Sequence, residues 1–286
     1  MSLLAISIII VSAVMHATWN YLAKRSQGGF AFVWLYILMS SIIYAPIVVV
    51  VFLIQPFSFG WMHLFMIIAS AIIHLIYSLI LQKGYQKGDL SLVYPIARGT
   101  GPLIVAVMAL FLFDEQLTWI GVTGISLIIL GVFVITGGLH IFKKGDTSTS
   151  VYYGLIIGVA IASYTLLDKS AVSVFAVSPL LLNYGGIVTQ VLMLTPFARR
   201  NWKEVRASWK HHRKEAIGVG FLFPLAYLLI LMTMTFTPVS YVAPVREVSI
   251  LIGAIMGAYL LKEGFGPRRI VAAVMMIIGI SCVAIS

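Results

Sequence analysis

The sequence predicts an all-α integral membrane protein with ten transmembrane helices arranged as two inverted five-helix repeats. Apolar residues make up 61% of the 286 residues, and only 10% are charged. Because a soluble domain carries about a quarter of charged residues, this composition indicates a bilayer environment. The number of apolar stretches and the recurrence of one segment along the chain are the two further observations behind the prediction.

Ten apolar stretches are long enough, or nearly so, to cross the hydrocarbon core of a bilayer, which takes about 20 residues of helix. Short polar turns separate most of them, so consecutive helices should pack antiparallel. The predicted helices cover residues 3–23, 30–54, 61–82, 90–113, 117–137, 151–171, 179–197, 216–237, 239–261 and 268–285. The longest polar interval, 198–215, is expected to form a loop.

One charged segment occurs twice. A shift of 148 positions places Arg98 on Arg246 and Glu115 on Glu263, so the two charges keep a separation of 17 in both copies. Apolar coincidences are frequent between oily segments, whereas a repeated pair of charges is not. This recurrence indicates an internal duplication, which is how many transporters are built.

The duplication divides the chain into a first repeat at 1–139, a linker at 140–149 and a second repeat at 150–286. In the first helix of each repeat, a shift of 145 places Trp19 on Tyr164. Because five helices is an odd number, the second repeat must enter the membrane in the opposite orientation.

Basic residues predict the orientation in the membrane. Of the 19 lysines and arginines, 16 fall in the loops after helices 1, 3, 5, 7 and 9. The positive-inside rule therefore predicts that these loops are cytoplasmic, that both termini lie outside, and that the protein resides in the cell (inner or plasma) membrane. The basic segment 199–214 suggests a loop facing anionic membrane lipids, and no nucleic-acid partner is expected.

Arg98 is the least expected residue in the fourth predicted helix. At about 1.5 Å per residue it lies roughly 12 Å from the start of the helix. A cation at that depth is costly unless it faces a polar cavity or a partner. Pro95 and Pro102 lie in the same helix, and irregular backbone inside a membrane is tolerated only where protein or water surrounds it. We therefore expect this helix to line a substrate path.

Polar side chains recur three or four positions apart on several predicted helices, a spacing that puts them on one helix face. These stripes are His16, Trp19 and Asn20; Ser70, His74, Tyr77 and Ser78; Ser91, Tyr94, Pro95 and Arg98; and Asn183, Gly186 and Gln190. Stripes on several helices predict one shared central cavity.

The stripes and the repeated arginines supply the candidate substrate-binding residues. A guanidinium group holds a carboxylate or a phosphate through paired hydrogen bonds, and aromatic rings pack the apolar part of a substrate. The candidates are Arg98, Tyr94, His16, Trp19, Asn20, His74, Tyr77 and Arg246. Glu247 is the candidate for an ion pair or for a coupling proton. No residue pattern indicates a metal ion or a cofactor.

Structural explanations for the same residues stay open. Arg246 and Glu247 could form an ion pair that Arg98 joins, and the two histidines could bond backbone carbonyls. Asn183 and Gln190 could link neighbouring helices. Acidic residues at helix ends (Glu115 and Glu263) would cap turns. Small residues mark close helix contacts; they are Gly121, Gly124, Gly131, Gly154, Gly158, Gly253 and Gly257.

Several motifs resemble a known family. They are the pattern E-x8-G-x2-L-I-x2-G-V from Glu115 to Val132, HATWN at 16–20 and YPIARG at 94–99. Together with the ten helices, they resemble the EamA family of the drug/metabolite transporter superfamily. The resemblance implies a multi-pass carrier, commonly an exporter of amino acids or similar metabolites that is driven by the proton gradient.

The second repeat departs from this pattern. Ile250 stands where a proline would repeat, and Ala272 replaces a glycine. A smoother ninth helix is therefore expected, with the two repeats contributing unequally. Family members are often drawn with both termini in the cytoplasm, contrary to the basic-residue distribution, which we follow.

The predicted function is a secondary-active transporter, an exporter of a small polar or amphipathic metabolite such as an amino acid or a related organic anion, working by alternating access. Its partners would be that substrate, protons as a coupling ion, and membrane lipids. A phosphorylated or lipid-linked substrate is the alternative. An intramembrane enzyme is disfavoured because the sequence has no HExxH, no GxSxG and no acidic cluster for metal chemistry.

Overall fold

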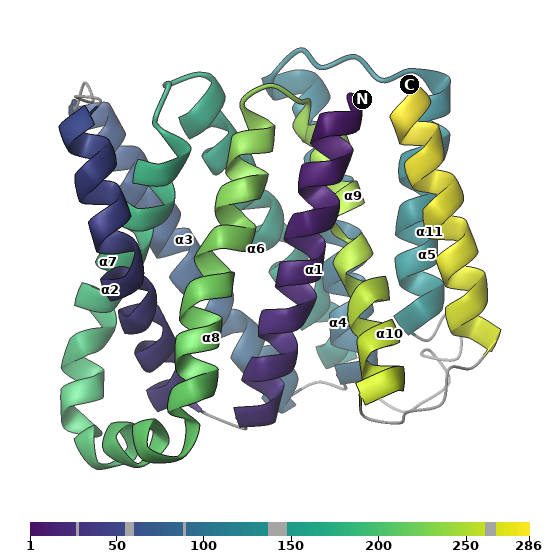
Figure 1. The fold of residues 1–286 in the computed structure, drawn as a ribbon. Coiled ribbons are helices and arrows are strands. Elements are labelled where there is room, and N and C mark those ends of the chain that lie inside the picture. Colours follow the sequence, from purple (N-terminus) through teal and green to yellow (C-terminus); the bar gives the residue numbers. More distant parts are fainter. Residues whose placement is uncertain (27–28, 55–59, 88–89, 137–147, 261–266) are drawn as a thin grey trace.

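The computed structural model describes residues 1–26, 29–54, 60–87, 90–136, 148–260 and 267–286. Within these ranges the chain is helical apart from short turns and ends. The helices are α1 (Leu3–Ser26), α2 (Phe30–Ile54), α3 (Trp61–Lys87), α4 (Leu90–Leu112), α5 (Trp119–Thr136), α6 (Ser148–Ser173), α7 (Pro179–Arg200), α8 (Trp202–Met234), α9 (Val239–Arg246), α10 (Val248–Leu260) and α11 (Pro267–Ile285). They form one bundle of helices lying side by side (Figure 1).

Long apolar runs explain why the chain is helical. In hydrocarbon every backbone N–H and C=O must be bonded within the protein, and a helix does this within one segment. Among the described residues, six helices are long and apolar enough to cross a membrane: α1, α2, α3, α6, α7 and α8. Shorter apolar segments lie in α4, α5 and α11. Large apolar side chains face outward, among them Leu53 at 79% and Phe111 at 75% exposure, as expected of a surface solvated by lipid.

Both chain termini lie at the same end of the bundle (Figure 1). The amine of Met1 donates hydrogen bonds to the carbonyl oxygens of Val283 and Ala284, at 3.4 and 3.3 Å. The start of α1 is therefore held against the last turn of α11.

Glycines create the closest helix contacts. A Cβ added to Gly124 of α5 would lie 2.6 Å from the carbonyl oxygen of Gly279 in α11. Gly154 and Gly158 leave equally little room between α6 and α4. These contacts confirm the expectation for Gly124, Gly154 and Gly158. The expectation for Gly253 is wrong, because nothing described lies within 4 Å of an added Cβ there.

The expected difference between the fourth and ninth helices is wrong. α4 is one helix from Leu90 to Leu112 that passes through Pro102. The ninth apolar stretch is divided instead into α9 and α10, with a turn at Glu247. The amide N–H of Glu247 donates to the carbonyl of Pro244, and the amide N–H of Ile250 donates to that of Glu247, at 3.0 and 2.9 Å. These bonds span three residues, which is the tighter pattern of a 3₁₀ turn.

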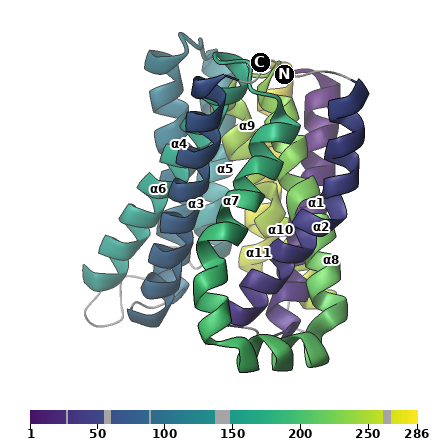
Figure 2. The ribbon, with the colours of Figure 1, turned by 90° about the vertical axis from the view of Figure 1, so that its left-hand side faces the viewer.

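The basic segment after α7 is a helix, so the expectation of a loop is wrong. α8 begins at Trp202 and bends at His212, where φ is −129° and ψ is 26°. Its first part lies across the end of the bundle opposite the termini (Figure 2). Trp202, Val205 and Trp209 recur at helical spacing, and Val205 is buried at 3% exposure. This spacing gives the segment one apolar face, typical of a helix that lies at a membrane interface.

Candidate functional site

A cavity of about 380 Å³ lies in the middle of the bundle. Residues of α1, α2, α3, α4, α6, α7, α8 and α9 line it, so both halves of the chain contribute. Its volume falls in the range of small-molecule pockets, roughly 300–1,000 Å³. Most of the wall surface is apolar, and polar side chains from several helices also face the space. Such a site suits a small amphipathic ligand.

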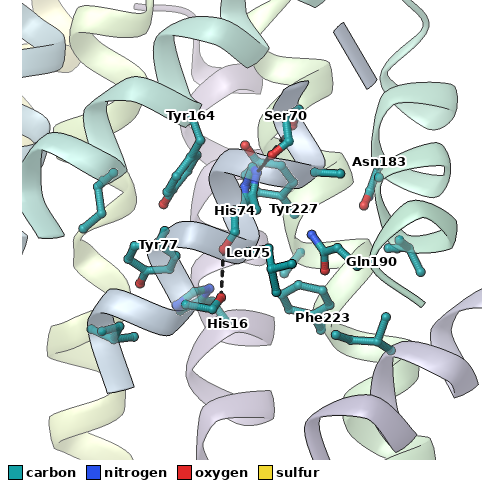
Figure 3. A pocket seen from close by; sticks show the side chains of 18 of the residues that line it. His16, Ser70, His74, Leu75, Tyr77, Tyr164, Asn183, Gln190, Phe223 and Tyr227 are labelled. Carbon is teal, nitrogen blue, oxygen red and sulfur yellow. Dashed lines mark hydrogen bonds between the residues drawn. The ribbon is translucent and has the colours of Figure 1, made fainter. Parts of the chain in front are cut away.

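The polar stripes of the sequence meet in this cavity. On α1, α3 and α7 every predicted stripe residue lines it: His16, Trp19, Asn20, Ser70, His74, Tyr77, Ser78, Asn183, Gly186 and Gln190. Arg98 and Arg246 also line it. Figure 3 shows Tyr77 and Tyr164 on one side of the space, and Asn183 and Gln190 on the opposite side. The side chain of Tyr94 lies outside the described part of the structure.

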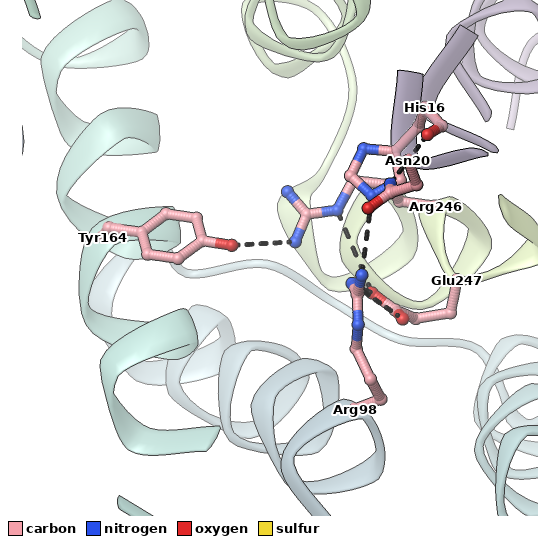
Figure 4. A network of polar contacts seen from close by, with 6 residues as sticks. All are labelled: His16, Asn20, Arg98, Tyr164, Arg246 and Glu247. Atoms are coloured by element: carbon pink, nitrogen blue, oxygen red, sulfur yellow. Dashed lines mark hydrogen bonds and ion pairs between the residues drawn. The ribbon is translucent and has the colours of Figure 1, made fainter. Parts of the chain in front are cut away.

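Glu247 lies between the two arginines. Arg98 Nη1 donates to both carboxylate oxygens of Glu247, each at 3.2 Å. Arg246 Nε is 4.0 Å from Glu247 Oε1. The carboxylate side chain is 1% exposed, whereas the Arg98 side chain is 14% exposed and that of Arg246 is 9% exposed. Figure 4 shows the three groups close together. Two guanidinium groups thus share one carboxylate, which leaves one positive charge in excess beside the cavity.

Each arginine has a second contact with a ring of the first helix of its own half. Arg98 Nη2 is 3.5 Å from His16 Nε2, and Arg246 Nη2 is 3.5 Å from the hydroxyl of Tyr164. Both pairs are separated by 82 residues in the chain. Because a guanidinium group only donates hydrogen bonds, His16 accepts through Nε2 and its ring is neutral.

An aromatic wall adjoins this charged cluster. The rings of His16 and Trp19 meet edge to face at 5.0 Å, and those of Trp19 and Phe223 at 5.3 Å. Tyr36 also packs against Phe223, at 5.6 Å. The indole Nε1 of Trp19 is buried without a hydrogen-bond partner among the described residues. Asn20 donates to the backbone carbonyl of His16 at 2.7 Å, so its amide nitrogen supports α1.

His74 and Asn183 have structural partners as well as cavity positions. His74 Nδ1 lies 2.9 Å from the carbonyl oxygen of Ser70, the kind of backbone contact expected as the structural alternative. Asn183 donates to the carbonyl of Pro224 in α8 at 2.7 Å, which confirms the predicted interhelical bond. Glu115 accepts hydrogen bonds from the amides of Val239 and Ser240, at 2.8 and 3.0 Å. It therefore caps the start of α9, in the other half of the chain, where the sequence had suggested the cap of a turn.

Sequence reasoning missed Asp168. This carboxylate on α6 is fully buried, and the hydroxyl of Tyr227 donates to its Oδ2. His74 Nε2 lies 3.9 Å from the same oxygen. Asp168 falls near the end of a predicted helix, where an acidic residue suggested no more than a boundary. Glu263 lies outside the described residues, and no group of three or more metal-ligating side chains occurs in the part that the structure describes.

Comparison with known protein families gives one match. Residues 148–285 match the EamA-like transporter family. The second half of the chain is therefore an EamA-like domain, and this domain and the apolar helices make the chain a multi-pass membrane protein. The match covers the second repeat, in which Ile250 and Ala272 depart from the family motif of the first repeat.

The comparisons with other proteins support the fold. One solved chain, whose description reads only "Crystal structure of protein", has a TM-score of 0.79 with this chain at 12% identity. The similarity covers 98% of this chain and 97% of that one. At this identity the likeness shows the fold alone. No curated protein matches the chain.

Proposed function

We propose that this protein is a secondary-active carrier that exports a small polar or amphipathic metabolite, such as an amino acid or a related organic anion. The observation that carries the proposal is the central cavity, which both Arg98 and Arg246 line. The two arginines come from different halves of the chain, and the EamA-like family is a family of transporters. The export direction is the one that the family resemblance implies.

The excess positive charge beside the cavity selects the anionic end of the substrate. The one negative charge of Glu247 faces the two positive charges of Arg98 and Arg246. A substrate carboxylate at this place would bind through charge-assisted hydrogen bonds. It would lie close to Arg98, the most exposed member of the cluster.

The rest of the cavity fits the remainder of such a substrate. Trp19, Tyr36 and Phe223 form an aromatic wall that would pack an apolar side chain. Gln190 and the unpaired indole N–H of Trp19 offer polar contacts. The candidate substrate-binding residues of the sequence therefore keep this role in the proposal, with Tyr36 and Phe223 added.

Alternating access of two inverted repeats, 1–139 and 150–286 joined by a linker, is the proposed mechanism. The helix neighbours support it, because α1 packs against α8 as α6 packs against α3, and α5 packs against α11. α1 runs away from the end that holds the termini, and α6 runs toward it (Figures 1 and 2). Rocking of one half against the other would expose the cavity to each side in turn.

The orientation in the cell membrane follows from the basic residues. Basic residues gather at the end of the bundle opposite the termini (Figure 1). Examples are Arg25 near the end of α1, Lys83 near the end of α3, and Arg206 in the part of α8 before the bend at His212, which we call the lateral part of α8. We propose that this end is cytoplasmic and that both termini lie outside. The lateral helix would then lie on anionic lipid head groups.

A phosphorylated or lipid-linked substrate is the second candidate. Two guanidinium groups that converge on one carboxylate would suit a phosphate as well. An experiment with separate pools of amino acids and of phosphorylated metabolites distinguishes the two.

Counterflow in proteoliposomes tests the function. Vesicles with the purified protein are loaded with one unlabelled pool, and the entry of a labelled trace of the same pool is measured. We expect exchange of the amino-acid pool, and its loss in Arg98→Ala and Arg98→Lys. Arg25→Ala is the matched control, because the Arg25 side chain is 66% exposed. Undiminished exchange in both Arg98 variants would remove Arg98 from the site.

A further inference from the structure

The buried pair of His74 and Asp168 connects the two halves of the chain. His74 belongs to α3, and Asp168 belongs to α6. The facing atoms, His74 Nε2 and Asp168 Oδ2, are 3.9 Å apart. His74 lines the cavity with 21% of its side chain exposed, and Asp168 lies behind it with no exposure. The pair can therefore exchange a proton with cavity water through the histidine ring.

The hydrogen bonds of His74 leave a place for one proton. A backbone carbonyl only accepts hydrogen bonds, so His74 Nδ1 must donate to the carbonyl of Ser70 at 2.9 Å. In a neutral ring Nε2 then carries a lone pair, which faces the carboxylate. Asp168 Oδ1 has no hydrogen-bond partner among the described residues. An ionised carboxylate buried in this way is costly unless it is paired. As long as neither group carries a proton, two hydrogen-bond acceptors face each other. One proton, on Nε2 or on the carboxylate, turns one of them into a donor.

The other charged and titratable groups near Asp168 are already engaged. On α8, Tyr227 donates to Oδ2. On α9, Arg246 acts electrostatically on the carboxylate, and its nearest acidic partner is Glu247. On α6 itself, Lys169 donates to the carbonyls of Met234 and Thr237, at 2.7 and 3.2 Å. On α4, Arg98 contacts Glu247 and His16, and on α6 the hydroxyl of Tyr164 contacts Arg246.

We propose that the His74–Asp168 pair, and not Glu247, binds the coupling proton, and that this proton enters the cavity together with the anionic substrate. The inference rests on the proposed function and deepens it. The carboxylate of Glu247 is already engaged, because the guanidinium groups of Arg98 and Arg246 lie beside it at 3.2 and 4.0 Å. The proton comes from water in the cavity and returns to water when the site opens to the other side.

The charges of the site set the direction of coupling. With a proton on the pair, its net charge is zero, and the excess positive charge of the Arg98, Arg246 and Glu247 cluster is available to an anion. Without the proton, the carboxylate of Asp168 cancels that excess. Proton and anion therefore favour each other and move in the same direction. An outward substrate gradient then drives export of both, in place of the proton gradient that the family resemblance implies.

Infrared difference spectra test proton binding without any substrate. Spectra of the purified protein at about pH 5.5 and at about pH 8.5 are subtracted from each other. Exposed carboxylates are ionised at both pH values. Imidazolium and carboxylic acid have separate bands, so either location of the proton is detected. We expect Asp168→Asn to lose one protonation signal, and the controls Asp114→Asn (an exposed carboxylate) and Glu247→Gln to keep it. The isosteric asparagine can still accept a hydrogen bond from Tyr227.

Proteoliposome flux tests the coupling. In the wild-type protein we expect the half-saturation concentration of the labelled amino-acid pool to fall as the pH falls. A pH gradient, acidic on the side of the substrate, should accelerate net flux. Asp168→Asn should retain counterflow and lose both pH effects.

Two results would overturn the inference. The first is an Asp168→Asn protein whose infrared difference spectrum matches that of the wild type. The second is retention of both pH effects on flux in this variant. If the wild-type protein showed no counterflow, the proposed function would fail, and the infrared comparison would decide the proton site by itself.

Discussion

Arg98 and Glu247 join the two halves of the protein through one guanidinium nitrogen, which lies 3.2 Å from each carboxylate oxygen. Arg98 comes from the middle of α4, and Glu247 occupies the turn between α9 and α10. The break in the ninth apolar stretch therefore occurs where a buried carboxylate is directed to an arginine of the other half. The contact both supports the fold and adjoins the cavity, so its two roles need separate tests.

Removal of the Arg98 side chain should destabilise the protein. Arg98→Ala leaves Glu247, which is 1% exposed, with the more distant Arg246 as its cation. Loss of one partner of a buried ion pair costs about 3–5 kcal/mol. We expect a lower melting temperature of the purified variant.

The double variant Arg98→Ala/Glu247→Gln separates the two roles. The glutamine amide at position 247 carries no charge, so no buried carboxylate is left without its arginine. The melting temperature should therefore recover toward the wild-type value, while counterflow should stay lost. A double variant as unstable as Arg98→Ala, or one that restores counterflow, would contradict this division.

The cap on α9 should contribute to stability from the other half of the chain. Both oxygens of Glu115 accept hydrogen bonds from the first amides of α9, those of Val239 and Ser240. A carboxylate at a helix N-terminus also interacts favourably with the helix dipole. We expect Glu115→Ala to cost about 1–2 kcal/mol in thermal unfolding, and Asp114→Asn, at the exposed neighbouring position, to leave the melting temperature unchanged. Equal melting temperatures for both variants would argue against the cap.

The contact between α5 and α11 should be too close to accommodate one added methyl group. A Cβ on Gly279 would lie 2.7 Å from the carbonyl oxygen of Gly124, and backbone cannot yield as a side chain can. Gly279→Ala should destabilise by about 1–3 kcal/mol. Gly253→Ala in α10 is the matched control, because its added Cβ meets nothing described within 4 Å. This control should be neutral or stabilising by about 0.5–1 kcal/mol. If Gly253→Ala destabilised the protein more than Gly279→Ala, α5 and α11 would not be in the close contact described.

Cysteine labelling can determine the orientation in the membrane. The chain has a single cysteine, Cys282, so Cys282→Ser gives a clean background. Trp61→Cys, at a position 87% exposed at the start of α3, should react with an impermeant maleimide in whole cells. Arg206→Cys, in the lateral part of α8, should react only after the membrane is opened. The reverse pattern would place both termini in the cytoplasm.

The positions of the helices could be predicted from the sequence because spanning a bilayer requires long apolar runs, and these dominate the composition. The local breaks could not. Pro102 suggested an interruption in α4, yet the helix continues. The turn at Glu247 lies where its carboxylate meets Arg98 of α4, and such tertiary contacts leave no local signal. The lateral part of α8 did leave one, the spacing of Trp202, Val205 and Trp209, but its many charges concealed it.

The alignment of the first helix of each half determined which site residues could be predicted from the sequence. His16 with Arg98 and Tyr164 with Arg246 are each separated by 82 residues, so a shift of 148 relates the first helices of both halves as well. That shift places Asn20 on Asp168 and would have drawn attention to this carboxylate. The shift of 145, which placed Trp19 on Tyr164, is wrong, because the two contacts make His16 the counterpart of Tyr164 instead.

Competition in the counterflow assay tests most directly that the arginine cluster holds the anionic group of a passing substrate. Entry of the labelled amino-acid pool is measured against an excess of unlabelled amino acids, and against the corresponding amines, which lack the carboxylate. We expect the amino acids to compete and the amines not to compete, with no specific entry left in Arg98→Ala/Glu247→Gln. Equal competition by the amines, or undiminished entry in that variant, would contradict the account.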